Sequence, residues 1–303
     1  MPIVTLARHA MATRFEVVLH GESEAHLRAA AEEALVEVNR LENQLSLYRS
    51  GSEIAQLNAR AAHEPVRVSP EVFALLQQAA KLSAETRGAF DITIAPLVRC
   101  WGFMGGCGRM PNPDEVETAR SLVGMDKVSF DVRERTVQFS RPGVMLDLGA
   151  IGKGYAVERG LEILREAGVT SALLHGGTST VGAIGHPPEA EAWRVAVDLP
   201  VAEGNAPLHE FALCDEALSV SAVTGRMFAV QDQKFGHVID PRTGQPVAHA
   251  ALAAVVALRA TETDALSTAL LTLGAVGQET TTGLRPGLRT LVVDAQGVVT
   301  TSG

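Results

Sequence analysis

The sequence predicts an α+β fold in which mixed, largely antiparallel sheets pack against helices. Short alternating runs such as residues 12–20 and 193–200 are typical of strands. Turn residues separate several of these runs, and the helical segments between them are too few for strict strand–helix alternation. No repeat, low-complexity tract or linker divides the chain. We therefore expect one domain over residues 1–303, built from two closely packed lobes.

Helix signals dominate the first half of the chain. Apolar side chains recur at helical spacing from Leu27 to Leu45, behind Ser23, a residue type that caps helices. Pro70 follows Ser69 at the first helical position, which favours a helix start. The expected elements are a strand at 12–20, a helix at 23–45, a loop with a short helical turn at 46–59, a helix from 69 to about 86 and, beyond Gly88, a loop leading into a half-buried strand at 90–98.

Short strands dominate the second half. Glycine and proline crowd residues 102–113 and predict a loop, and the turn signals beyond it favour antiparallel pairing. The expected elements are strands at 127–131, 136–140, 143–148, 172–177, 193–200, 217–222, 237–240 and 251–258, helices at 155–167 and 261–273, and a closing hairpin at 290–300.

The composition describes a folded, acidic chain. Its 303 residues are 46% hydrophobic, and 26 Lys and Arg stand against 35 Asp and Glu, a formal charge of −9. Disorder as the main state is excluded, because it requires low hydrophobicity and high charge density. A general nucleic-acid partner is disfavoured, because surfaces that follow phosphates need a positive excess. Aromatic residues make up only 4%, which leaves little material for base stacking.

Cysteine use and the N-terminal sequence bear on the compartment. An odd set of cysteines, Cys100, Cys107 and Cys214, favours a reducing compartment over a disulfide framework, and no metal-type spacing links them. The N-terminal run is too short and too polar to be a signal peptide. The sequence has no apolar run of about 18 residues that would predict a membrane span. As the sequence stands, we expect a cytoplasmic protein; a chain trimmed of an export signal would look the same.

A glycine-rich turn at 146–155 is the first candidate site. A strand-like run ends in Asp147, and Gly149, Gly152 and Gly154 surround Lys153 before a helix. Glycines let a backbone approach a ligand, free N–H groups at a helix start favour anions, and lysine adds a charge suited to phosphate. The alternative is a tight strand–helix turn with a solvated lysine. The pattern is neither a P-loop nor a dinucleotide fingerprint.

A helix start at 261–270 is the second candidate site. Asp264, Ser267 and Thr268 have the spacing of one helix face, so a carboxylate and two hydroxyls can converge. Such an oxygen set suits Mg²⁺, which takes few protein ligands. The alternative is structural, because Thr261 and Asp264 form an imperfect capping box.

Two further segments carry weaker signals. Residues 240–244 form an Asp-Pro-x-x-Gly turn, and His237 precedes it, where a neutral imidazole can take a proton. The alternative is a hairpin tip with a structural histidine. Residues 87–93, which contain Ala89, Phe90 and Asp91, predict a loop, and Tyr48 in a polar loop is a candidate stacking ring.

Together and in this order, these segments resemble the ApbE family, the FAD:protein FMN transferases. The matching pieces run from Met11 to Gly274, and the specific ones are LDLGAIGKGYAVE at 146–158 and HVIDPRTG at 237–244. The resemblance implies bound FAD and Mg²⁺, transfer of the FMN half of FAD to a threonine hydroxyl of an acceptor protein, and release of AMP.

The resemblance also implies positions for the site. The residues expected around FAD are Met11, Tyr48, Ala89, Phe90, Asp91, Asp147, Lys153 and Val238. The residues expected around Mg²⁺ are Asp264, Ser267, Thr268 and, through its carbonyl, Ala150. In the mechanism that the resemblance implies, the acceptor threonine would attack the FMN-side phosphorus, and Mg²⁺ and Lys153 would neutralise charge on the diphosphate. His237 is the candidate base.

Three departures from the family pattern leave other functions open. Ala12 stands where the family has glycine, Thr178 stands where the family has aspartate, and residues 219–222 read Ser-Val-Ser-Ala where it has a Thr-Ser-Gly segment. One alternative is hydrolysis of FAD to FMN and AMP, with water replacing the threonine. The lost carboxylate motivates another, a protein that binds FAD without turning it over.

Overall fold

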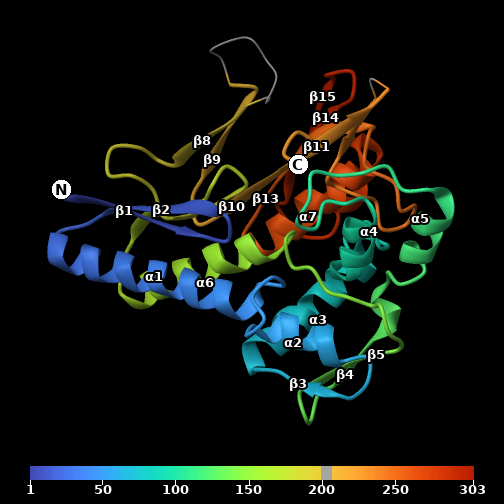
Figure 1. Cartoon of the computed structure of the whole chain (residues 1–303). Helices are drawn as coiled ribbons and strands as arrows, with labels where there is room; N and C mark the ends of the chain where they lie inside the picture. Colours follow the sequence, from blue (N-terminus) through green and yellow to red (C-terminus); the bar gives the residue numbers. More distant parts are fainter. Residues whose placement is uncertain (199–206, 232) are drawn as a thin grey trace.

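One eight-stranded sheet, antiparallel throughout, organises the molecule (Figure 1). The computed structural model describes residues 1–198, 207–231 and 233–303. In spatial order the strands are β1 (Ile3–Ala10), β2 (Thr13–His20), β6 (Ser171–Gly176), β7 (Thr180–Ile184), β10 (Ala217–Ala222), β13 (Ala250–Ala257), β14 (Arg289–Asp294) and β15 (Val299–Ser302). The α+β class with antiparallel sheets is confirmed.

Three helices cover one face of this sheet: α1 (Glu24–Leu45), α6 (Gly152–Glu166) and α7 (Ala260–Leu273). Helix α6 packs on α1, β6 and β7, and α7 packs on β10 and β13. Two glycines permit the close approach of α6 to the sheet. A Cβ atom on Gly160 would lie 2.5 Å from Leu174, and one on Gly182 would lie 2.5 Å from Leu161. This contact fixes the position of α6, whose N-terminus carries the glycine-rich turn.

A separate hairpin covers part of the other face of the sheet. It consists of β8 (Trp193–Val197) and β9 (His209–Leu213), drawn above β2 and β10 in Figure 1. Trp193, Phe211 and Leu213 pack on the sheet in an apolar cluster of their own, and Trp193 donates a hydrogen bond to the carbonyl of Ile184 (3.3 Å). The expected strand at 193–200 is therefore β8; residues 199 and 200 lie outside the described residues.

Residues 46–150 add helices and a small sheet beside the main one. The elements are α2 (Glu53–Arg60), α3 (Pro70–Glu85), α4 (Ala95–Cys100), α5 (Pro113–Arg120) and the strands β3 (Val66–Arg67), β5 (Thr136–Phe139) and β4 (Val128–Asp131), paired in that order. The remaining elements are 3₁₀ turns at Ile92–Ile94, Met125–Lys127 and Ala275–Gly277, α8 (Gln278–Thr282), β11 (Met227–Val230) and β12 (Gln233–Gly236).

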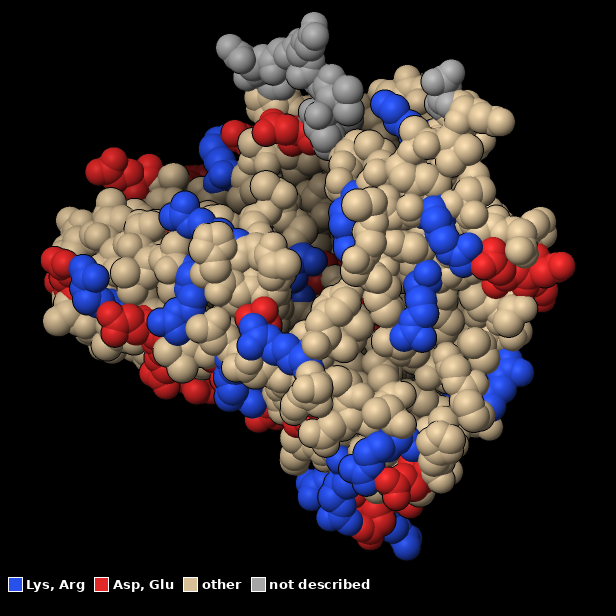
Figure 2. Space-filling view, viewed as in Figure 1, with Lys and Arg blue, Asp and Glu red and all other residues tan. Residues whose placement is uncertain are grey.

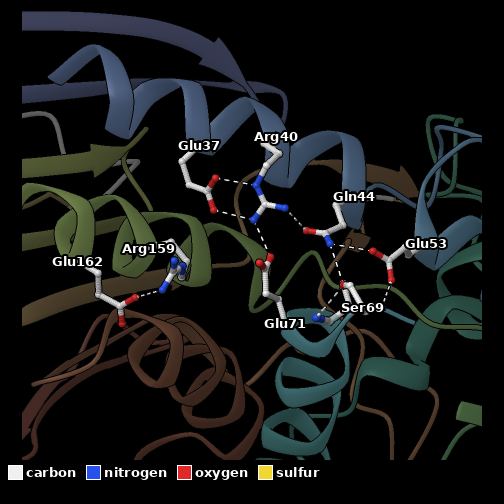
Figure 3. Close-up of polar contacts among 9 residues, drawn as sticks. Glu37, Arg40, Gln44, Glu53, Ser69, Glu71, Arg159 and Glu162 are labelled. Atoms are coloured by element: carbon white, nitrogen blue, oxygen red, sulfur yellow. Dashed lines mark hydrogen bonds and ion pairs between the residues drawn. The ribbon is translucent and has the colours of Figure 1, made fainter. Parts of the chain in front are cut away.

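A polar network joins α1 to the starts of α2 and α3 (Figure 3). Arg40 of α1 bonds Glu37 on its own helix (2.7 Å) and Glu71 in the first turn of α3 (2.6 Å). Gln44, also on α1, donates to Glu53 (2.8 Å) and Ser69 (2.9 Å). The hydrogen bond from Arg40 holds the pKa of Glu37 below its usual range. The network thus fixes α2 and α3 against the helix that supports α6.

Four of the thirteen Phe, Trp and Tyr side chains form one cluster. Trp101, Phe228 and Phe235 stack at centroid distances of 5.2–6.4 Å, and Phe103 adjoins them. Trp101 donates a hydrogen bond to the carbonyl of Gly244 (2.8 Å). The cluster therefore anchors both the hairpin of β11 and β12 and the turn that follows His237.

Several sequence predictions need correction. Residues 90–98 form a 3₁₀ turn and α4 rather than a strand, because the Asp91 carboxylate caps the turn through the Thr93 N–H (2.8 Å). Residues 143–148 form no strand; the amide side chain of Asn58 hydrogen-bonds both backbone groups of Leu146 (2.7 and 2.9 Å) and takes the place of a partner strand. Strand β1 and the full two turns of α2 were not predicted.

The expected strand at 237–240 is also wrong: only Ile239 forms an isolated bridge, to Pro246, because Asp240 already folds the following turn by accepting the N–H of Arg242 (2.9 Å). The remaining expected elements are present, with shifted ends. Ser23 and Ser69 cap α1 and α3, and their side chains accept from the N–H groups of His26 and Val72. Helix α7 ends at Gly274, which has a positive φ of 70°. The closing hairpin is β14 and β15, which pair directly. In the part of the chain that the structure describes, no helix combines the length and the apolar character needed to cross a bilayer.

Candidate functional site

A cavity of about 1060 Å³ collects nearly all the predicted site residues. Figure 2 shows the hollow in the middle of the face that it draws. Its wall includes Met11, Tyr48, Ala89, Phe90, Asp91, Asp147, Ala150, Lys153, His237, Val238, Asp264 and Thr268. Ser267, the remaining predicted residue, is fully buried and does not reach the wall. Segments far apart in the sequence thus meet at one place.

The glycine-rich turn forms the polar floor of this cavity. Asp147 accepts the N–H of Gly149 (2.8 Å), which folds the turn, and Lys153 reaches the carbonyl of Gly149 (3.3 Å). Burial raises the pKa of the Asp147 carboxyl, while the Gly149 N–H and the charges of Arg226 and Lys153 act against that rise. The floor therefore places two cations near one half-buried acid at the start of α6.

Helices α6 and α7 supply each other's N-terminal partners. The Asp264 carboxylate of α7 accepts the N–H of Gly154 in the first turn of α6 (2.8 Å). In return, Glu158 of α6 accepts the N–H of Thr261 at the start of α7 (3.0 Å) and pairs with Arg259. We call this arrangement the reciprocal cap. It satisfies N–H groups that each helix leaves open.

The reciprocal cap replaces the capping box that the sequence allowed. The residue at the cap position of α7 is Arg259, and no side-chain cap hydrogen bond forms there. The Thr261 hydroxyl is buried and has no hydrogen-bond partner among the described residues. The alternative in which Thr261 and Asp264 form a local capping box is therefore wrong.

Gly154 is required at the crossing of the two helices. A Cβ atom there would lie 2.2 Å from the carbonyl oxygen of Ala260 and 2.6 Å from Cβ of Asp264. Distances below 3.0 Å to backbone force a shift of the chain. This glycine therefore lets Asp264 approach the turn that carries Lys153.

Hydroxyl groups lie next to Asp264, on α7 and on the neighbouring strand β10. Its side chain is 4% exposed, and its Oδ2 atom takes the Gly154 N–H, whereas Oδ1 accepts no hydrogen bond within the described ranges. Ser221 of β10 lies 2.8 Å from the hydroxyl of Ser267 and 3.1 Å from that of Thr268. One carboxylate with neutral oxygens matches the ligands that Mg²⁺ takes beside substrate phosphates. The residues present therefore fit Mg²⁺.

A second kind of metal centre has no support among the described residues. No group of three or more His, Cys, Asp or Glu side chains gathers there to hold an ion. The Mg²⁺ set predicted from the sequence is of another type, since it contains a single acid. It stays a prediction.

His237 lies in the cavity wall beside the aromatic cluster. The backbone N–H of Arg226 donates to its Nδ1 atom (3.3 Å), so the neutral ring carries its proton on Nε2. Burial lowers the pKa of His237, and the charges of Arg226 and Lys153 lower it further. The ring is thus neutral at pH 7 and offers the cavity an N–H donor.

The residues expected around the flavin nucleotide differ in what they offer. Tyr48 is 63% exposed, so its ring is free for a ligand, whereas Phe90 is 2% exposed and belongs to the core. The Asp91 carboxylate is already bonded to Thr93, Ser83 and the N–H of Met125. Tyr48 is therefore the ring in this group available for stacking.

The three departures from the family pattern all lie at or next to the cavity. Met11 and Ala12 form the turn between β1 and β2 with φ of 50° and 59°, a conformation that favours glycine. Thr178 is exposed in the wall, and no carboxylate stands at that position. Ser221 and Ala222 line the wall too.

Sequence reasoning missed part of the wall. Arg226 joins Lys153 as a cation near Asp147 and His237. Leu173, His175 and Val181 come from the sheet, and the run 194–198 comes from β8. No local motif marks these residues, because only the strand order of the sheet brings them to the cavity.

Known proteins resemble this chain over nearly its whole length. The model of the ApbE family matches residues 11–292. An FAD:protein FMN transferase of Haemophilus influenzae is 27% identical over 282 residues, 90% of this chain and 81% of the relative. One of Treponema pallidum is 31% identical over 264 residues, 82% and 73% of the two chains.

Solved structures of similar proteins have the same fold as this chain. The ApbE protein of Thermotoga maritima superposes with a TM-score of 0.90 at 28% identity, over 99% of this chain and 97% of the other. The flavinyl transferase ApbE of Pseudomonas stutzeri, in its apo form, gives 0.85 at 29% identity, over 99% and 95%. The fold and the relatives define an enzyme of the transferase class. The chain belongs to the ApbE family.

Proposed function

We propose that this protein transfers the FMN moiety of FAD to a threonine hydroxyl of an acceptor protein, with Mg²⁺ bound and AMP released. One observation carries the proposal. Lys153, Arg226 and Asp264, with hydroxyl groups beside the acid, face one cavity large enough for a dinucleotide. Relatives along most of the chain bear the name FAD:protein FMN transferase.

The protein's part in binding is electrostatic. Lys153 and Arg226 supply positive charge for the diphosphate, and the start of α6 adds the partial charge of a helix N-terminus. Asp264, Thr268 and the carbonyl of Ala150 would hold Mg²⁺, and Ser267 supports them through Ser221. When bound, Mg²⁺ neutralises charge on the phosphate oxygens. The exposed ring of Tyr48 offers a stacking surface for the flavin.

The chemistry is an in-line displacement at phosphorus. The threonine oxygen forms a bond to the FMN-side phosphorus, the bond from that phosphorus to the bridging oxygen breaks, and AMP leaves with that oxygen. One proton from the threonine is released per turnover. Enzymes accelerate such loose transition states chiefly by positioning and charge stabilisation, which is what cations held in one cavity provide.

His237 takes a donor role in this scheme. Its neutral ring carries the proton on Nε2, so it can donate to a diphosphate oxygen. To act as the base that the sequence suggested, the ring needs the other tautomer, and that tautomer loses the hydrogen bond from Arg226. We therefore propose that His237 stabilises the charge of the leaving phosphate.

One experiment separates this function from the two alternatives. The purified protein is incubated with FAD, MgCl₂ and a pooled library of synthetic peptides that share a central threonine, and the products are weighed by mass spectrometry. FMN-modified peptide supports the transferase. Free FMN and AMP without modified peptide support FAD hydrolysis. Unchanged FAD that stays bound supports a binding protein.

A further inference from the structure

The cavity extends beyond the residues assigned to FAD and Mg²⁺. Those residues lie in the β1–β2 turn, the loops that carry Tyr48 and Asp91, the glycine-rich turn, residue Val238 and helix α7. Part of the remaining wall lies on the face of the main sheet turned away from α1, α6 and α7. We call this second part the sheet arm; it is lined by Leu173, Val181, Leu218, Val220, Leu252 and residues 194–198.

Strand β8 presents an edge to the sheet arm. It pairs with β9 alone among the described strands. Side chains alternate across a strand, yet every residue from Arg194 to Asp198 lines the cavity. Lining by consecutive residues, rather than by alternate ones, is what a strand edge presents to a cavity. The N–H and C=O groups on this edge thus face the space that also contains Lys153 and Asp264.

The floor of the sheet arm is apolar and partly uncovered. Leu173 of β6 and Val220 of β10 are half-buried, because the β8–β9 hairpin covers only part of this face. Their neighbours Val181 and Leu218 complete a flat apolar surface. An extended peptide has both features that fit: backbone groups for a strand edge, and alternate side chains for the surface beneath it.

We propose that an extended segment of the acceptor protein binds in the sheet arm as a strand added to the free edge of β8. The inference rests on the proposed function, which requires a polypeptide as second substrate. The arm is continuous with the wall that carries Lys153, so a threonine in the added strand enters the cavity that holds the diphosphate. A dinucleotide has no backbone ladder and cannot use the edge.

The proposal predicts a period of two in the acceptor. In an added strand, every second N–H bonds the edge, and every second side chain faces the apolar floor. Sequencing of the FMN-modified peptides from the library should therefore show apolar residues at alternate positions around the threonine. N-methylation, one position at a time in a selected peptide, should raise KM about tenfold at alternate positions only.

A matched pair of variants tests the floor. Leu173 and Val18 are direct cross-strand partners on the same face of the sheet, and both are half-buried, but Val18 does not line the cavity. Leu173→Gln should raise KM for a selected peptide about tenfold, because a buried amide replaces an apolar contact. Val18→Gln should leave it unchanged. FAD affinity, measured by flavin fluorescence, should stay at the parent value in both.

The outcomes distinguish the two proposals. If no peptide is modified, the transferase function itself is overturned. If peptides are modified but show no period of two, or if Leu173→Gln and Val18→Gln have equal KM values, the transferase stands and strand addition is wrong. A loss of FAD affinity in Leu173→Gln also contradicts the proposal, because it would place the nucleotide in the sheet arm.

Discussion

The two ends of the cavity are built in different ways. At the glycine-rich end, polar groups already have partners within the protein: Asp147 holds the turn, and Asp264 takes an N–H of α6. In the sheet arm, β8 and the half-buried Leu173 leave an edge and an apolar face that no described segment covers. A preorganised end suits charge stabilisation, and an incomplete end suits a partner that completes it.

This comparison predicts where a substitution acts. Changes at the glycine-rich end should alter the reaction with every acceptor, including water, whereas changes in the sheet arm should alter only the reaction with the peptide.

The largest effect is expected at Asp264. Asp264→Ala removes the single acid of the predicted Mg²⁺ set, so FMN transfer should fall at least about a thousandfold. The same change removes the partner of the Gly154 N–H, so circular dichroism must show that the fold is intact. Asp264→Asn, which keeps an oxygen acceptor for that N–H, serves as the structural control and should be as inactive. Parent-like turnover in either variant would disprove the assignment.

The next effect concerns His237. If the ring acts as a donor, His237→Ala should lower kcat about a hundredfold, while His237→Gln, which keeps an N–H donor, should recover part of that loss. A base would give equal losses in both variants. Single-turnover rates with FAD and a selected peptide measure the difference, which also tests whether this part of the glycine-rich end is preorganised.

A smaller effect is expected at Lys153. Lys153→Ala should weaken FAD binding about tenfold to a hundredfold, because one charged contact with the diphosphate is lost. Lys127 is the control, since it bonds Asp126 and the carbonyl of Val123 and does not line the cavity. Titration of flavin fluorescence measures the FAD affinity of Lys153→Ala and of the control variant Lys127→Ala. Equal FAD affinities in the two variants would show that the diphosphate does not bind at the glycine-rich turn.

The smallest effect concerns the stability of the turn between β1 and β2. Ala12 has a φ of 59°, so Ala12→Gly should relieve about 1 kcal/mol of backbone strain and raise Tm by about 2 °C. Ala10→Gly is the control; Ala10 is buried at the end of β1, and a glycine there should lower Tm. Calorimetry compares them. A Tm for Ala12→Gly at or below that of the parent would show that no strain is stored at this turn.

Local motifs explain why much of the site was predictable. The glycine-rich turn, the start of α7 and the turn after His237 can each be recognised from a few consecutive residues, and residues of all three line the cavity. The sheet arm was not predictable, because Leu173 and Val181 face it only through the strand order β6–β7–β10. Arg226 has no motif around it at all.

The fold shows the same division. Helices α1 and α3 were predicted because Ser23 and Ser69 cap them locally. The prediction of a strand at 143–148 was wrong because Asn58, which is distant in the sequence, supplies the hydrogen-bond partner that a neighbouring strand would have given. The prediction of a strand at 90–98 was wrong because the Asp91 carboxylate caps a 3₁₀ turn there, although the apolar run resembles a strand.

The reciprocal cap has a consequence for how the enzyme is assembled. The two hydrogen bonds join residues 110 and 103 positions apart, so neither can form until both halves of the chain have folded. Loop closure over such separations is slow compared with helix formation. A chain truncated during synthesis therefore has the glycine-rich turn but not the acid beside it. Under the proposed function, catalytic competence therefore arrives in one late, cooperative step with α7, and incomplete chains cannot cleave FAD.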